Sequence, residues 1–212
     1  MAYPYPFEDI DLKLYTSIAD NIETIYRVQK LLGLSDSTNN VALEAVIVGL
    51  GFLSKACHLD FEHSTFADMM AHGCEGVLFA SAFKFQNYLD VEINKDGYSK
   101  AIDNLSKIPQ LKTSVEIRIG SIQDYFPFHA EVVYLDCTKL SDSMCDEGIL
   151  VEMFFRLARR MLAGSYLLLV TIMDNLTPDD FGADHLQSLS RSRICIGSQK
   201  ESMMWIYKKI GE

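Results

Sequence analysis

Hydrophobic and polar positions along the chain follow two different patterns. In residues 9–34, apolar side chains recur every three or four positions, which predicts an amphipathic helix that ends near Gly33. A polar turn then leads into a second helix, predicted over residues 41–57. From residue 65 onward, short apolar or alternating runs take turns with helical segments. This alternation indicates a parallel sheet that is covered by helices on both faces.

The same patterns place the individual elements of the second part. Helices are expected over residues 77–85, 97–107 and 147–162, between strands at residues 65–68, 88–93, 115–119, 131–136 and 165–171. Two last strands, at residues 193–196 and 203–210, are separated by the mostly polar stretch at residues 197–201 and predict an antiparallel hairpin at the sheet edge. We therefore expect one α/β unit over residues 61–212, with a helical extension over residues 1–60 packed on it.

Composition narrows the classes of function. The chain has 212 residues, of which 49% are hydrophobic and 23% charged, as in an ordinary globular protein. Its net charge of −10 argues against nucleic acid as a direct partner and favours a basic protein or a small molecule as substrate. A partner protein in a complex is also compatible with this charge. The five scattered cysteines predict free thiols in a reducing compartment, cytoplasm or nucleus. No signal peptide, membrane span or metal-ligand spacing is expected.

Candidate chemistry collects where the parallel strands end, because ligands of open parallel sheets bind beyond the carboxyl ends of the strands. Residues 68–76 are expected to form the turn after the first strand, starting at Asp68. Glu92 ends the second strand, 24 residues later, where a carboxylate can accept both ribose hydroxyls of a nucleoside cofactor. Ser121 and Ile122 follow the third strand, and Asp136 ends the fourth and is expected to face the reacting group.

Each candidate also has a simpler interpretation. Asp68 could cap the following helix, and His72 could be an exposed loop residue. Asp136 could be a turn carboxylate or a partner for Lys139. Cys74, like Cys137, could be a reactive thiol, although a small buried thiol is the simpler interpretation.

In sum, this order of motifs resembles the class I S-adenosylmethionine methyltransferases. The resemblance covers residues 66–210 and rests on the loop after strand one, the acid after strand two, Gly120-Ser121, the run Tyr134-Leu135-Asp136, and a Gly164-led fifth strand with a closing hairpin. The helix before residue 59 and the stretch Phe66-Ala67-Asp68 are most similar to the disruptor-of-telomeric-silencing type of histone lysine methyltransferase.

The resemblance implies a Rossmann-like fold, S-adenosylmethionine as cofactor and no metal. It implies a seven-stranded, mostly parallel sheet and methyl transfer to a protein lysine or another nitrogen nucleophile. Asp136 would be the catalytic residue. The residues implied in cofactor binding are Asp68, Met70, His72, Gly73, Glu75, Glu92, Ser121 and Ile122.

The chain also departs from the family pattern. Where the family has three glycines in its first loop, an ungapped alignment gives Met70, His72 and Cys74, whose side chains are expected in the path of the cofactor. A shift by one residue would use Gly73 and Gly76 instead. Two functions therefore stay open: an active methyltransferase, and a methyltransferase-like binding or scaffold subunit that has lost catalysis.

Overall fold

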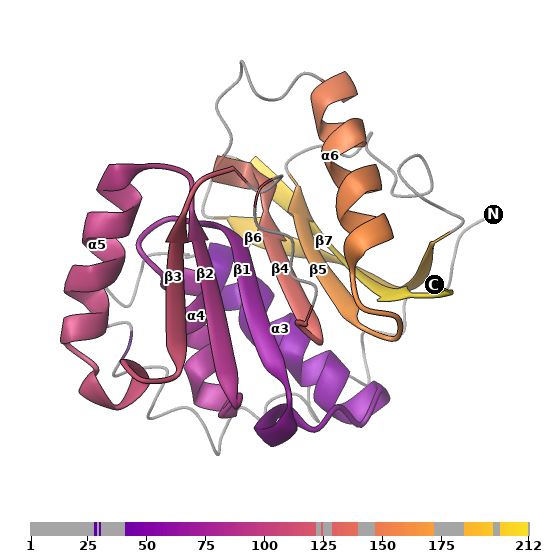
Figure 1. The fold of residues 1–212 in the computed structure, drawn as a ribbon. Coiled ribbons are helices and arrows are strands. Elements are labelled where there is room, and N and C mark those ends of the chain that lie inside the picture. The colour runs from indigo at the N-terminus through magenta and orange to yellow at the C-terminus, as the bar shows by residue number, and fades with distance from the viewer. Residues whose placement is uncertain are drawn as a thin grey trace.

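The computed structural model describes residues 28, 30, 41–121, 124, 129–139, 147–171, 185–196 and 200–211. In this part of the chain a seven-stranded sheet has the order β3-β2-β1-β4-β5-β7-β6 (Figure 1). The first five strands are parallel, β7 runs antiparallel to β5, and β6 runs antiparallel to β7. The strands are β1 (Thr65–Ala71), β2 (Asn87–Glu92), β3 (Val115–Ile119), β4 (Val132–Asp136), β5 (Tyr166–Thr171), β6 (Leu186–Ile196) and β7 (Lys200–Lys209). The expected mostly parallel sheet with a C-terminal antiparallel hairpin is confirmed.

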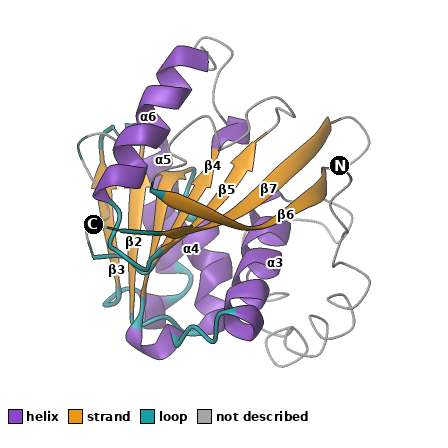
Figure 2. Ribbon diagram, turned by 90° about the vertical axis from the view of Figure 1, so that its right-hand side faces the viewer, coloured by secondary structure: helices purple, strands orange, loops and turns teal. Residues whose placement is uncertain are grey.

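Helices cover both faces of this sheet (Figure 2). One face packs against α3 (Val41–Ala56), α4 (Glu75–Ala80) and α5 (Lys95–Ser106), and the other packs against α6 (Glu147–Arg160). Each face has its own cluster of buried apolar side chains. Short 3-10 helices complete the connections: η1 (Phe61–His63), η2 (Ser81–Phe83), η3 (Pro109–Leu111) and η4 (Cys137–Lys139).

Burial along the strands explains why the sequence pattern located most of them. Every residue of β4 and β5 is buried, as expected for central parallel strands with helices on both faces. At the sheet edge, no residue of β3 is fully buried: Val115, Ile117 and Arg118 are half-buried, and Glu116 and Ile119 are exposed. The sequence therefore marks the central strands as continuous apolar runs and the edge strand as an alternating one.

Several predicted boundaries were wrong; β7, for example, begins at Lys200 and not at residue 203. β1 continues to Ala71, three residues beyond the predicted strand, because the side chains of Met69, Met70 and Ala71 are buried in the core. The register with β2 shifts after Asp68. The helix expected over residues 77–85 is split into α4 and η2. β6 begins at Leu186, seven residues early, because pairing with β7 satisfies the backbone of a polar edge strand that has no strong apolar pattern.

Little of the amino-terminal extension is described. Of the helix predicted over residues 9–34, the structure describes only Val28 and Lys30, both helical, and Val28 is buried in the core. The next helix, α3, contacts α4 and β5 and so lies on the main sheet. The domain boundary at residue 60 stays a prediction. No helix in the described part of the chain is long and apolar enough to cross a membrane.

Candidate functional site

Three buried acids lie on one face of the neighbouring strands β1 and β2. Asp68 and Asp90 are paired in the parallel register, and Glu92 pairs with Ala71 at the carboxyl end of β2. Asp68 is 2% exposed and Glu92 1% exposed, and the charges of both act on the Asp90 carboxyl. The fold thus brings Asp68 and Glu92 together as the sequence predicted. However, Asp68 lies within β1 and not in a turn after it. Both acids are buried and do not lie at the rim of an open cleft.

The carboxylate of Glu92 holds the turn that follows β1. Its Oε1 accepts hydrogen bonds from the backbone amides of Gly73 at 2.7 Å and Cys74 at 3.0 Å. Its Oε2 accepts no hydrogen bond from the described residues, and a Cβ built on Gly97 of α5 would come within 2.2 Å of that oxygen. Cys74 caps α4 without a side-chain hydrogen bond, and Glu92 satisfies the backbone amides of the two residues that lead into this helix.

The turn itself keeps a backbone that usually requires glycine. Gly73 has φ +80° and Cys74 has φ +64°, both in the left-handed region. From the α5 side, the Asn104 amide donates to the Gly73 carbonyl at 2.9 Å, and Lys100 Nζ lies 3.0 Å from His72 Nε2. The turn is therefore held between Glu92 on its inner side and α5 on its outer side, and its Cys74 has a backbone conformation that residues other than glycine seldom adopt.

Two side chains that the sequence analysis expected in the path of the cofactor, those of Met70 and Cys74, point into the protein interior. Met70 is buried against the α6 face, and Cys74 is fully buried beneath the turn. Burial, followed by the charges of Asp90, Asp68 and Glu92, raises the pKa of the Cys74 thiol well above its usual range, so it is a neutral, buried group. His72 is the exposed member of the three. The structure thus places the side chains of Met70 and Cys74 in the interior, and whether they contact a cofactor stays a prediction.

The remaining acids gather around Tyr134 of β4. Burial and then the charges of Asp136, Asp68 and Glu75 raise the pKa of the Tyr134 phenol well above its usual range. Asp136 is itself buried at the end of β4, and its Oδ1 accepts hydrogen bonds from the backbone amide, at 3.0 Å, and the hydroxyl of Thr138. The catalytic candidate Asp136 therefore lies near the cofactor candidates Asp68 and Glu75, and it also shapes the turn after its strand.

Sequence reasoning missed two exposed isoleucines beside Glu92. Ile119 pairs with Glu92 in the register of β2 and β3 and is 38% exposed, and Ile93, which follows Glu92, is 41% exposed. An apolar residue directly after a strand-ending acid was the signal that could have found Ile93. Ser121 follows β3 and is exposed, and its amide lies 3.3 Å from the Asp124 carboxylate. Ile122 lies outside the described residues.

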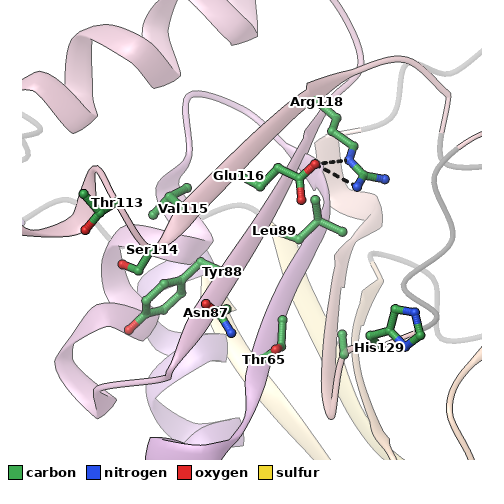
Figure 3. A pocket seen from close by; sticks show the side chains of 11 residues that line it. Thr65, Asn87, Tyr88, Leu89, Thr113, Ser114, Val115, Glu116, Arg118 and His129 are labelled. Atoms are coloured by element: carbon green, nitrogen blue, oxygen red, sulfur yellow. Dashed lines mark hydrogen bonds and ion pairs between the residues drawn. The ribbon is translucent and has the colours of Figure 1, made fainter.

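A cavity of about 450 Å³ lies away from these acids (Figure 3). Its lining includes Thr65 and Asn87 at the amino ends of β1 and β2, and His129 just before β4. Glu116 and Arg118 of β3 form an ion pair of 2.7 Å at its wall and so neutralise each other's charge. Neither Asp68 nor Glu92 lines this cavity, which therefore does not belong to the acid cluster.

The residues around Glu92 suit an adenosyl group chemically. The carboxylate has one buried oxygen without a donor among the described residues, the kind of atom that a ribose hydroxyl satisfies. Ile93 and Ile119 offer exposed apolar surface next to it, as a purine ring requires. In the described ranges, no group of three His, Cys, Asp or Glu side chains could hold a metal ion.

Comparisons with known proteins agree with this fold. No protein-family model and no curated protein sequence matches the chain. Among solved structures, a proposed RNA methyltransferase of Pyrococcus horikoshii is 15% identical with a TM-score of 0.63, and the match covers 91% of this chain and 100% of that one. The P. horikoshii protein TYW2, in complex with MeSAdo, is 9% identical with a TM-score of 0.58 over 84% of this chain and 65% of that one.

The chain is shorter than some of these neighbours. It spans 64% of a proposed transferase from P. horikoshii, to which it is 9% identical with a TM-score of 0.57 over 79% of its own length. Identities this low establish the fold and not the reaction. The described part of the chain has the Rossmann-like fold of the class I methyltransferases.

Proposed function

We propose that this protein is an S-adenosylmethionine-dependent methyltransferase that binds its cofactor at the carboxyl ends of β1 and β2. The observation that carries the proposal is the left-handed turn at Gly73 and Cys74, held by the Glu92 carboxylate beside exposed apolar surface. A backbone that approaches a ligand closely, an acid for ribose and an apolar slot for a purine are the elements that an adenosyl site combines.

Each part of the site has a distinct role in this proposal. Glu92 would accept the ribose hydroxyls, and Ile93 and Ile119 would contact the adenine ring. The protein backbone at the Gly73–Cys74 turn would come closest to the cofactor. The bound cofactor supplies an electrophilic methyl group. The protein's own contribution is to orient the cofactor and the nucleophile in line and to exclude water, which is where most of the rate of such a transfer arises.

We further propose a basic, nitrogen-containing substrate. The net charge of −10 favours encounter with a positively charged molecule, and the resemblance around residues 59–68 favours a protein lysine. Asp136, close to Tyr134, is the group proposed to orient or deprotonate the nucleophile. A methyl-transfer assay that offers lysine-rich peptides and bulk tRNA side by side tests this choice, because one of the similar structures is described as a proposed RNA methyltransferase.

A binding or scaffold subunit is the second candidate, and one observation favours it. Glu92 is buried and already bonded to two backbone amides, so a ligand must open the turn before it can reach the carboxylate. If that opening is too unfavourable, the fold persists without the cofactor.

Calorimetric titration with S-adenosylhomocysteine separates the two functions. We expect saturable binding that weakens by about tenfold or more, roughly 1.4 kcal/mol, in Ile119→Asp, which places a charge beside the proposed adenine slot. Ile210→Asp is the matched control, since Ile210 is 39% exposed and follows β7, near the other edge of the sheet. A folded protein that gives no heat at millimolar ligand overturns the enzyme proposal and leaves the scaffold.

A further inference from the structure

One buried acid in this cluster has no assigned role. Asp90 lies in β2, two residues before Glu92, and is completely buried. Neither of its carboxyl oxygens accepts a hydrogen bond from the described residues. Together with Glu92 Oε2, three buried carboxyl oxygens on one face of β2 thus lack a donor in the described part of the chain. A buried carboxylate without donors is strongly disfavoured, and a proton is the smallest addition that relieves it.

Most of the surroundings of Asp90 favour its neutral form. Asp68 faces it from β1 and Glu92 from β2, and both add negative charge. The thiol of Cys74 reaches it from the turn before α4, and the neighbour from β3 in the register is the apolar Ile117. Burial is the largest cause that raises the pKa of Asp90 well above its usual range, followed by the charges of Asp68 and Glu92 and by the side-chain contact with Glu92, whereas the contact with Cys74, the smallest contribution, lowers that pKa.

We propose that Asp90 carries a proton in the folded protein and donates it in a hydrogen bond to the Glu92 carboxylate, which makes Asp90 a positioning residue for the turn at Gly73 and Cys74. The pair then holds a single negative charge. Glu92 receives a third donor beside the two amides, and the carboxylate is fixed where it meets the turn. The Cys74 thiol also interacts with the Asp90 carboxyl group, which links the unusual turn conformation to this proton.

A functional consequence follows, and this part rests on the proposed function. If Glu92 accepts the ribose hydroxyls, Asp90 sets the position of that acceptor without touching the ligand. Asparagine at position 90 keeps a neutral donor of similar shape, whereas alanine removes the donor. Asp90→Asn should therefore retain affinity for S-adenosylhomocysteine within about threefold, and Asp90→Ala should lose about tenfold or more.

The proton itself is tested without any cofactor. Denaturant unfolding of wild type and Asp90→Asn is compared between pH 5 and pH 7.5. An unfolded aspartate ionises near pH 3.9, so each pH unit above that value should weaken the folding equilibrium of wild type about tenfold relative to the variant. Asp103→Asn is the matched control, because Asp103 is an exposed aspartate of α5, and its ratio to wild type should not change in this range.

The outcomes are distinct. A constant ratio for Asp90→Asn means that Asp90 is ionised in the folded protein and overturns the proposal. If Asp90→Asn does not fold, infrared spectroscopy of wild type at pH 7 replaces it. A protonated-carboxyl band that shifts with carbon-13 aspartate labelling supports the proposal, and its absence overturns it. If wild type binds no S-adenosylhomocysteine, the proposed function fails, while the unfolding and infrared results still decide the protonation of Asp90.

Discussion

Replacing Gly97 by alanine tests the position of Glu92 through the free energy of unfolding. Gly97 is the third residue of α5, and its φ lies outside the left-handed region, so alanine fits the backbone there. In an ordinary helix this change stabilises a protein by about 0.5–1 kcal/mol. Here the new Cβ would come within 2.2 Å of Glu92 Oε2 and 3.1 Å of its Cδ. We therefore expect the sign of the effect to be reversed.

The magnitude follows from what holds Glu92 in place. Its carboxylate cannot move away without stretching its bonds of 2.7 and 3.0 Å to the amides of Gly73 and Cys74. Overpacking costs about 1–3 kcal/mol, and a weakened charge-assisted hydrogen bond adds roughly 1.5–3 kcal/mol. After the helix gain is subtracted, Gly97→Ala should destabilise the protein by roughly 1.5–5.5 kcal/mol.

Urea denaturation, followed by circular dichroism, measures this change, and a double-mutant cycle supplies the control. In a Glu92→Ala background the carboxylate is gone, so Gly97→Ala should become stabilising by about 0.5–1 kcal/mol. The reasoning is refuted if Gly97→Ala stabilises the otherwise wild-type protein, or if its effect is the same in both backgrounds. Either result would mean that Glu92 does not lie against α5.

Two further perturbations address the turn and the core. Asn104→Ala removes the hydrogen bond to the Gly73 carbonyl, so we expect a loss of about 1 kcal/mol in the free energy of unfolding and faster hydrogen exchange at the amides of Gly73 and Cys74; unchanged exchange would mean that α5 does not hold the turn. Burial raises the pKa of Tyr88 to about 12, so the stability that its neutral phenol provides is complete below pH 10 and is lost as the pH rises through 12. Wild type should therefore lose stability more steeply than Tyr88→Phe over that range, and parallel curves would refute the assignment. At neutral pH, Tyr88→Phe should cost about 1–3 kcal/mol, because the Phe85 amide loses its acceptor at 3.0 Å.

Sequence alone determined the order of the elements and the end of the sheet at which the acids gather. β3 matches its predicted bounds, because apolar and polar side chains alternate along its five residues, even though Arg118 is half-buried and Ile119 is exposed. The helix α6 begins at its predicted residue for a similar reason, since its apolar stripe reports one buried side. Once the strands are parallel, their carboxyl ends must share an edge, so the grouping of Asp68 with Glu92 follows from the order of the strands.

Only the tertiary structure decided what these acids contact. The bonds from Glu92 to the turn join residues 18 and 19 positions apart, and no local periodicity encodes which backbone amide a carboxylate will meet. The extension of β1 to Ala71, the inward side chain of Cys74 and the exposure of Ile119 depend on how α4, α5 and β3 pack around the turn. The periodicity of the sequence indicates whether a side chain is buried, whereas the packing of the complete fold determines which group that side chain contacts.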